Sequence, residues 1–545
     1  MTQAAWTRDF VDALVAAGVR DLAISPGSRS TPLAIAATVH PALTCHAIID
    51  ERSAAFFALG HGKRTGRPAA LLCTSGTAGA HYYPAVIEAS LSHAPLLVIT
   101  ADRPAELADC DAPQTVDQRD LYGRHVRRYF DLGIADASDD ARRGMMRKAA
   151  QAVALTIGPV PGPVHVNAPA RKPLEPTGPV PRPRDVSIAE VRRPIAHPDP
   201  ETVAELAEAL RRAERGVIVA GPAPIANADA RAPVARLVRA TGFPLLAEAA
   251  SQLRFGAGLG CDGFDALLRD AAFRDAHAPD LIVQLGAAPT STGWREYAAR
   301  YRDCPRWIVA PHGWNDPHNT AAIHVAADVA ATAAAVADAL DIERPPGAWR
   351  DAFAAWSPPD DGESRVARDS VAALPAGALL CVGNSKPIRT VDASCAGGAT
   401  ELAVWSQRGA NGIDGLVSGA AGAAAAQDTP ALLLLGDVSF AHDVGGLAAA
   451  RDVAVPFAIV VVDNGGGRIF EQLPIAGLDR IDGIDFTKHW LTPPPGSIES
   501  IARAFDIPYA RYQGRATIAA ALERRGPSII HAVVGGVHAV VRGQP

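Results

Sequence analysis

The sequence lacks the features that mark disulfide-rich, zinc-binding or nucleic-acid-binding proteins. Its 545 residues include seven cysteines, which are scattered and form no C-x-x-C pair, so neither a disulfide framework nor a zinc site is indicated. The net charge of −6 at pH 7 and the isoelectric point near 6.2 give no electrostatic reason to expect nucleic acid or an anionic membrane as a partner.

Long apolar runs are also absent. The runs PLLVIT, ALLLLG and PFAIVVV are far shorter than the roughly 20 residues that a membrane-spanning helix requires. The opening MTQAAWTRDFVDAL has neither the basic nor the apolar region of a secretory signal. With 48% apolar and 20% charged residues, the composition is typical of a well-packed globular protein. We therefore expect a soluble, cytoplasmic protein.

The chain is too long for one hydrophobic core, and its pattern predicts an α/β fold with parallel sheets, because strand-like runs alternate with helical stretches throughout. Proline-rich passages at 168–186, 343–349 and 357–362 interrupt this rhythm. We predict three α/β domains, at residues 1–180, 190–343 and 362–545. The expected strands are 21–27, 45–50, 69–76, 95–101 and 162–169 in the first domain, 216–222, 244–250, 280–286 and 306–311 in the second, and 378–385, 401–407, 431–439, 456–464 and 528–534 in the third.

Two neighbouring strands of the third domain end in oxygen-bearing residues. One ends in Gly436-Asp437, the other in Asp463-Asn464, and a glycine run follows Asn464. In open parallel sheets ligands bind beyond the carboxyl ends of the strands, where these groups would converge. Carboxylate, amide and carbonyl oxygens suit Mg²⁺ that also binds substrate phosphates, and glycines allow close backbone approach. Ordinary turn chemistry is the alternative, and it weakens when both strand ends are considered together.

The first domain places a carboxylate, Glu51, between an apolar strand and an apolar helix. Such a residue is either a helix-terminal acid or a buried proton-transfer group. The segment LLCTSGTAGAHYYPAVIEA adds a turn of small residues that would let a ligand approach the backbone.

Four arginines fall near predicted strand ends: Arg29, Arg103, Arg389 and Arg408. Each alone is most simply a solvated surface residue. Together they suggest a site for substrates with several carboxylates, because guanidinium pairs with carboxylate in a bidentate manner.

Other catalytic signatures are missing from the sequence. No G-x-x-x-x-G-K-[ST] phosphate loop occurs, no local Ser-His-Asp or Cys-His signature is found, and the VIVAGPAP turn of the second domain lacks G-x-G-x-x-G. We therefore expect no bound dinucleotide.

The combined residues resemble the thiamine diphosphate enzymes. That family's motif runs from Gly-Asp-Gly to an Asn pair slightly under thirty residues later, and here it reads GDV…DN, departing at Val438 and Asp463. The segments ISPGSRSTPLA, DERSAAFFALG, TSGTAGAHYYPA, TADRPAEL, VGNSKPIR, QRGANGIDGL and NGGGRIFEQLP resemble the menaquinone-pathway branch of the family, in the expected order.

This resemblance implies a cofactor and the residues that hold it. The cofactor would be thiamine diphosphate with Mg²⁺, for which Mn²⁺ could substitute. Asp437, Asn464 and the carbonyl of Gly466 would bind the metal, and Glu51 would pair with the aminopyrimidine N1′. The other cofactor contacts implied are Ser385, Ile413, Gly436, Val438, Ile469 and Leu473, with Ile413 holding the cofactor bent.

The resemblance also implies the substrates, 2-oxoglutarate and isochorismate, and an active site shared between subunits of a homodimer or homotetramer. Ser385, Arg389 and Arg408 would face the part derived from 2-oxoglutarate. Ser28, Arg29, Arg103, Gln114 and Arg295 would face isochorismate.

Three departures from the family pattern matter most: Trp294 stands where a basic residue is common, His81 where Asn is common, and Val438 where the motif has glycine. Loss of a charge at Trp294 bears on isochorismate binding or loop closure, whereas we do not read Val438 as loss of metal binding. One alternative hypothesis is an acetolactate synthase or a simple 2-oxo acid decarboxylase, but the substrates of those enzymes need fewer cations in the site. Another is a non-catalytic protein of the same fold, which the intact Glu51 disfavours.

Overall fold

The computed structural model of the chain describes residues 3–256, 258, 260–480 and 483–535, and those residues form three parallel sheets. The chain divides into two compact units, one of residues 1–193, 407–428 and 442–454, the other of the remaining residues. One sheet lies in the first unit and two lie in the second. The three sheets lie at residues 21–169, 216–325 and 379–533.

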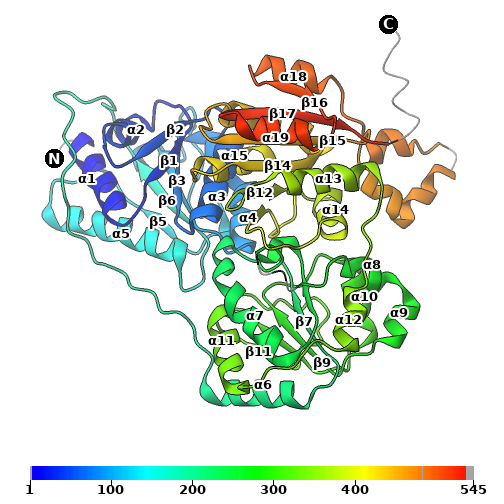
Figure 1. The fold of residues 1–545 in the computed structure, drawn as a ribbon. Helices are drawn as coiled ribbons and strands as arrows, with labels where there is room; N and C mark the ends of the chain where they lie inside the picture. The colour runs from blue at the N-terminus through cyan, green and yellow to red at the C-terminus, as the bar shows by residue number, and fades with distance from the viewer. Residues whose placement is uncertain (1–2, 257, 259, 481–482, 536–545) are drawn as a thin grey trace, which may run out of the picture. The chain divides into compact units, whose positions relative to one another are not determined.

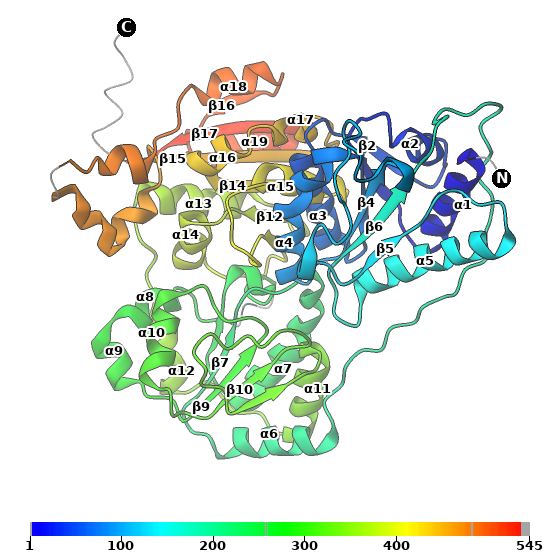
Figure 2. The same cartoon turned by 180° about the vertical axis from the view of Figure 1, so that it is seen from behind.

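The first unit contains a six-stranded sheet of order β2-β1-β3-β4-β6-β5. Its strands are β1 (Asp21–Ile24), β2 (Thr44–Ala47), β3 (Ala69–Cys73), β4 (Leu96–Asp102), β5 (Tyr129–Asp131) and β6 (Pro163–Pro169). Its helices are α1 (Gln3–Ala16), α2 (Thr31–Thr38), α3 (Glu51–Thr65), α4 (Tyr83–Leu91), α5 (Asp139–Ile157), α15 (Leu416–Ala425) and α17 (Gly446–Ala450). In the reverse view α5 lies beside β5 and β6 (Figure 2).

Helices α3 and α15 of the first unit pack with their backbones in contact. A Cβ atom on Gly60 of α3 would lie 1.8 Å from the carbonyl oxygen of Gly419, and one on Gly422 of α15 would lie 1.9 Å from that of Phe57. The crossing therefore requires glycine on both helices, since any side chain there would force them apart.

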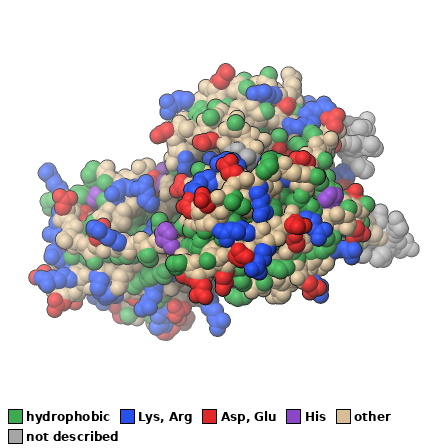
Figure 3. Space-filling view, turned by 60° about the horizontal axis from the view of Figure 1, so that its bottom comes forward, with side chains coloured by type: hydrophobic (Ala, Val, Ile, Leu, Met, Phe, Trp, Pro, Cys, Tyr) green, Lys and Arg blue, Asp and Glu red, His purple; other side chains and the backbone are tan. Residues whose placement is uncertain are grey.

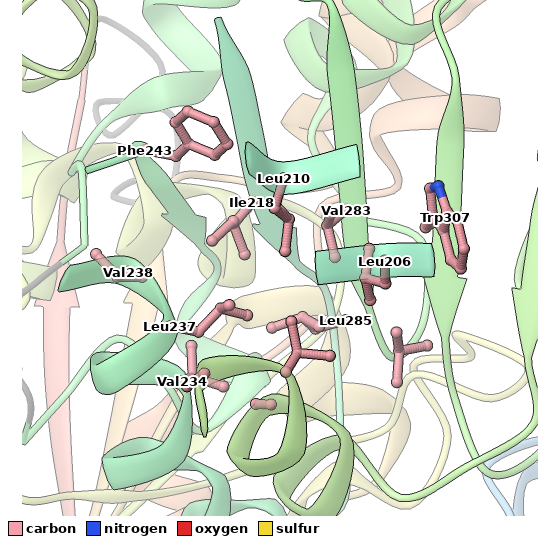
Figure 4. Packing of buried hydrophobic residues seen from close by; sticks show 14 of the residues in the cluster. Leu206, Leu210, Ile218, Val234, Leu237, Val238, Phe243, Val283, Leu285 and Trp307 are labelled. Carbon is pink, nitrogen blue, oxygen red and sulfur yellow. The ribbon is translucent and has the colours of Figure 1, made fainter. Parts of the chain in front are cut away.

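The second unit begins with a five-stranded sheet of order β11-β10-β9-β7-β8. Its strands are β7 (Gly216–Ala220), β8 (Leu245–Ala247), β9 (Leu281–Leu285), β10 (Arg306–Val309) and β11 (Ile323–Val325). Its helices are α6 (Pro200–Arg212), α7 (Arg231–Thr241), α8 (Phe264–Arg269), α9 (Ala271–Ala276), α10 (Thr292–Arg300), α11 (Val329–Leu340) and α12 (Ala348–Ala354). Leucine and valine side chains of α6 and α7 pack against Ile218 of β7 and against Val283 and Leu285 of β9 in its core (Figure 4).

The third sheet, also in the second unit, has the order β13-β12-β14-β15-β17-β16. Its strands are β12 (Leu379–Val382), β13 (Ala403–Ser406), β14 (Ala431–Gly436), β15 (Pro456–Asp463), β16 (Tyr509–Arg511) and β17 (Gly526–Val533). The helices in the same stretch of the chain are α13 (Gly362–Ala373), α14 (Lys386–Ser394), α16 (Asp437–His442), α18 (Ile498–Ala504) and α19 (Arg515–Glu523) (Figures 1 and 2).

The strands β5, β11 and β16 were not expected from the sequence. Each has three residues and lies at an edge of its sheet. Three residues are too few to display a period-2 pattern, and an edge strand needs less burial than a central one.

Acidic and basic side chains are interspersed on the face of the molecule drawn in Figure 3. This mixed surface agrees with the near-balance of 52 basic and 58 acidic residues.

Candidate active site

Two strand ends of the third sheet meet at one cavity. Strands β14 and β15 pair in parallel with Gly436 opposite Val462. The residues that follow the two strands therefore leave the sheet side by side, at the carboxyl ends of the strands. Asp437 is the first residue of α16, and Asn464 follows directly after β15. Both side chains line the cavity, as the topology of parallel sheets requires.

Asp437 and Asn464 each contribute a buried oxygen without a hydrogen-bond partner among the described residues, Oδ2 of Asp437 and Oδ1 of Asn464. The other carboxylate oxygen of Asp437 accepts a hydrogen bond of 2.9 Å from the Val438 amide. Buried oxygens without partners are rare and call for a ligand or water. The two unpartnered oxygens are hard donors and fit Mg²⁺.

Gly466 lies beside them in a backbone conformation that favours glycine. Its φ is 126°, and a Cβ atom there would lie 2.3 Å from the carbonyl oxygen of Leu491. The Gly466 carbonyl accepts a hydrogen bond of 2.8 Å from the Arg468 amide, which leaves one lone pair for a further contact.

The charges at the carboxyl ends of β14 and β15 also favour a cation. Burial, and after it the negative charge of Asp463, raise the pKa of Asp437 to about 6. No cluster of three or more His, Cys, Asp or Glu suited to a metal occurs in the part of the chain that the structure describes. Besides the Asp437 carboxylate, a cation here would therefore depend on amide and carbonyl oxygens and on ligands from outside the protein, such as phosphates and water.

Most other expected cofactor contacts of the second unit line the same cavity: Ser385, Gly436, Val438 and Ile469. Ser385 precedes α14 with φ 70°, an uncommon conformation for a residue other than glycine. Leu473 does not line the cavity and is 48% exposed.

Glu51, in the first unit, is the first residue of α3 and is half-buried. The preceding Asp50 caps the helix, accepting hydrogen bonds from the Arg52 amide at 3.0 Å and the Ser53 hydroxyl at 3.1 Å. This cap fixes the start of the helix and hence the position of Glu51. Ile49 is 81% exposed although it is apolar.

Three of the residues expected to bind isochorismate, Arg29, Arg103 and Gln114, lie beyond the carboxyl ends of strands of the first sheet. The Arg29 amide donates a hydrogen bond of 3.3 Å to the Thr74 hydroxyl, and burial, followed by the positive charge of Arg103, lowers the pKa of Arg29. The Arg103 side chain donates at 2.9 Å to the carbonyl of Pro113, and the neighbouring Gln114 bonds to the Ser75 carbonyl at 3.3 Å. Ser28 precedes Arg29 and is exposed.

Arg389, in the second unit, lies among charged residues of both signs. Burial lowers the pKa of Arg389, the negative charges of Glu248 and Asp265 oppose this shift, and the positive charges of Arg269 and Arg295 add to it. Trp294 is 1% exposed and belongs to the core, with the Arg306 guanidinium 5.9 Å from its ring centroid. It therefore faces the interior, where a charged residue would be costly.

Arg408 and Ile413 belong to a loop of the first unit that a buried acid holds. Glu88, 2% exposed, accepts hydrogen bonds from the amides of Gly409 at 3.0 Å and Ala410 at 2.7 Å. Lys63 pairs with the same carboxylate at 3.0 Å.

No sequence pattern selected Glu88. Sequence reasoning also missed Glu363 and Lys386, which line the cavity of the second unit. Only the adjacency of Lys386 to Ser385 offered a signal. His81 is exposed in a short 3₁₀ helix, Gly76–Tyr82, of the first unit.

Comparison with known proteins identifies the class. Residues 6–121 match the N-terminal TPP binding domain of thiamine pyrophosphate enzymes, and residues 403–532 match the C-terminal TPP binding domain. The fold is similar to that of benzoylformate decarboxylase from Polynucleobacter necessarius, with a TM-score of 0.74 and 16% identity, covering 97% of this chain and 98% of that one. Together with the oxygen-lined cavity, these matches define a thiamine diphosphate enzyme.

Full-length relatives identify the family within that class. The chain is 46% identical to 2-succinyl-5-enolpyruvyl-6-hydroxy-3-cyclohexene-1-carboxylate synthase of Sorangium cellulosum, covering 97% of this chain and 92% of the relative. It is 40% identical to the synthases of Natronomonas pharaonis (94% and 91% covered) and Geobacillus thermodenitrificans (96% and 92%). The chain belongs to this synthase family. Among the described residues no helix combines the length and apolar character needed to cross a membrane.

Proposed function

We propose that this protein joins 2-oxoglutarate to isochorismate with release of CO₂, forming 2-succinyl-5-enolpyruvyl-6-hydroxy-3-cyclohexene-1-carboxylate for menaquinone biosynthesis. The observation that carries the proposal is the pair of unpartnered oxygens, on Asp437 and Asn464, in a chain that matches synthases of this name along nearly its full length. Thiamine diphosphate, when bound, supplies the nucleophilic carbon and the electron sink for decarboxylation.

The second unit would hold the diphosphate end of the cofactor. Asp437, Asn464 and the Gly466 carbonyl would bind Mg²⁺, and Ser385 and Val438 would line the diphosphate. The buried oxygens support this role because they have no other hydrogen-bond partner in the described residues.

Glu51 would act at the other end of the cofactor, accepting or donating a proton at the aminopyrimidine N1′. Its place at the capped start of α3 supports this role, because a rigid carboxylate can keep a short hydrogen bond to a ligand. Ile413 would support the cofactor from the loop held by Glu88.

The arginines would bind the carboxylates of the two substrates. Arg389 and Arg408, with Ser385, would orient the five-carbon donor. Ser28, Arg29, Arg103, Gln114 and Arg295 would orient isochorismate. The bidentate way in which guanidinium groups bind carboxylates supports anionic substrates at both places.

The synthase would act in the cytoplasm as a homodimer or homotetramer, with domains at 1–180 (pyrimidine-binding), 190–343 (central) and 362–545 (diphosphate-binding). Ile49 lies two residues before Glu51, and its apolar side chain is 81% exposed. This exposure supports the proposal that a second subunit covers the surface beside Glu51. Light scattering of the purified protein tests the oligomeric state.

The test of the reaction is an assay with thiamine diphosphate, Mg²⁺ and 2-oxoglutarate, with and without isochorismate, in which products are identified by mass. We expect the succinylated adduct only when isochorismate is present, and a loss of at least about 10²-fold in rate in Glu51→Gln. Release of CO₂ with succinic semialdehyde as the only product would show that the acceptor is wrong.

A further inference from the structure

An asparagine that binds a cation must present its oxygen and turn its NH₂ group away. The two ends of the amide have nearly the same shape, so the hydrogen bonds around the side chain decide which end faces the cation. Asn464 lines the cavity with its Oδ1 atom buried and without a partner in the described residues. Something must therefore hold its Nδ2 atom on the opposite side.

Glu363 does so. Its Oε1 atom accepts a hydrogen bond of 2.9 Å from Asn464 Nδ2, across a separation of 101 residues in the sequence. Glu363 lies in the first turn of α13, and its side chain is 17% exposed. A carboxylate can only accept here, so the reverse orientation of the amide would place two oxygens against each other.

Lys386 holds Glu363 in turn. Its Nζ atom lies 2.7 Å from the same Oε1 atom, so both contacts meet on one oxygen. Lys386 is the first residue of α14, directly after Ser385. This ion pair stabilises the charged form of Glu363 and restricts the position of its carboxylate.

We propose that Glu363 is a positioning residue for the metal site: it orients the Asn464 amide so that Oδ1 faces the cation, and Lys386 fixes Glu363 in place. The proposal rests on the proposed use of Mg²⁺ in this cavity. Partners of metal ligands commonly fix ligand orientation in this way, and their loss typically costs about 10–100-fold in metal affinity.

Two substitutions separate orientation from charge. Glu363→Gln keeps an oxygen that can accept from Asn464 Nδ2 but removes the negative charge, whereas Glu363→Ala removes both. If Glu363 acts through the hydrogen bond, Mg²⁺ affinity falls about 10–100-fold in Glu363→Ala and stays within about threefold of wild type in Glu363→Gln. If it acts through charge, both variants lose affinity alike.

The measurement is calorimetric titration of Mg²⁺ into the full chain with thiamine diphosphate and no substrate, after unfolding curves confirm that each variant is folded. Glu106→Ala is the control, because Glu106 also forms an ion pair, with Arg171 at 2.5 Å, but on the exposed surface of the first unit. In assays, the variant Glu363→Ala should need more Mg²⁺ for half-maximal rate and regain most of its kcat at saturating Mg²⁺.

A second background keeps the test decisive if Glu363→Ala folds poorly. In Asn464→Asp either end of the side chain presents an oxygen. Glu363→Met keeps the side-chain length but offers no oxygen acceptor, so it should lower Mg²⁺ affinity in the wild-type background and not in this one. Equal affinity of wild type and Glu363→Ala, or equal losses in the Ala and Gln variants, would overturn the proposal. Failure of wild type itself to bind Mg²⁺ would overturn the proposed function as well.

Discussion

Asp437 is buried beside Asp463, and this environment makes its ionisation costly without a cation. The pKa of Asp437 is raised to about 6, so a proton competes with Mg²⁺ below that pH. We predict that Mg²⁺ affinity is nearly constant above about pH 7 and falls by up to about tenfold per pH unit below about pH 6. Mg²⁺ titrations between pH 5.5 and 7.5 check this, and an affinity independent of pH would contradict it.

The same raised pKa predicts that the metal-free protein gains from losing this charge. A carboxyl whose folded pKa exceeds its unfolded value contributes stability that is present at low pH and lost as the pH rises from about 4 through about 6. Asp437→Asn should therefore unfold at a higher temperature than wild type at pH 7.5 without metal, while its Mg²⁺ binding is lost. Equal or lower unfolding temperature would show that the ionised Asp437 is stabilised by groups other than the cation.

At the scale of elements, the crossing of α3 and α15 depends on close contact of two backbones. Gly60→Ala would place a methyl group 1.8 Å from the Gly419 carbonyl oxygen, so we predict a loss of about 1–3 kcal/mol in the free energy of unfolding, or more. Gly144→Ala in α5 is the matched control, because among the described residues no atom lies within 4 Å of the added Cβ. It should be neutral or stabilise by up to about 1 kcal/mol. Urea unfolding of both variants makes the comparison.

The loop that carries Arg408 is held by Glu88, which gives a second prediction at this scale. Glu88→Gln replaces one acceptor oxygen with a donor that faces the amides of Gly409 and Ala410. We expect a lower unfolding temperature and a KM for 2-oxoglutarate raised about tenfold, with a smaller change for isochorismate. Steady-state kinetics with each substrate varied in turn measure this, and Glu106→Gln, at a surface ion pair, is the control. Equal effects on both KM values would argue against a local role for the loop.

At the scale of the whole molecule, binding of the cofactor and metal should stabilise the folded chain by mass action. At a ligand concentration of 100 times Kd the gain is about 2.7 kcal/mol. We predict that thiamine diphosphate with Mg²⁺ raises the unfolding temperature by several degrees, and that a chelator reverses this. Differential scanning fluorimetry with each component alone and both together checks it, and additive small effects would contradict a shared site.

Much of this architecture follows from local sequence patterns. Strands such as 431–436 and 456–463 are apolar runs with clear ends, and parallel pairing then brings Asp437 and Asn464 to one edge. Glu363 could not be found in this way, because it lies on an ordinary helix 101 residues from its partner. Its role depends on tertiary packing, which a single sequence does not encode in any short motif.

The way Glu88 holds the Arg408 loop has a consequence for changing the enzyme. Glu88 contacts the backbone amide of Ala410, so it is indifferent to the side chain at that position. Gly409 and Asn411 are different. A Cβ atom on Gly409 would lie 2.7 Å from the Glu88 carbonyl oxygen, and Asn411 has φ 66°, a conformation that Asn and Gly adopt more readily than other residues. Directed evolution toward other oxo acid donors can therefore diversify 410 while keeping Glu88, Gly409 and Asn411, and the loop should retain its shape as its chemistry changes.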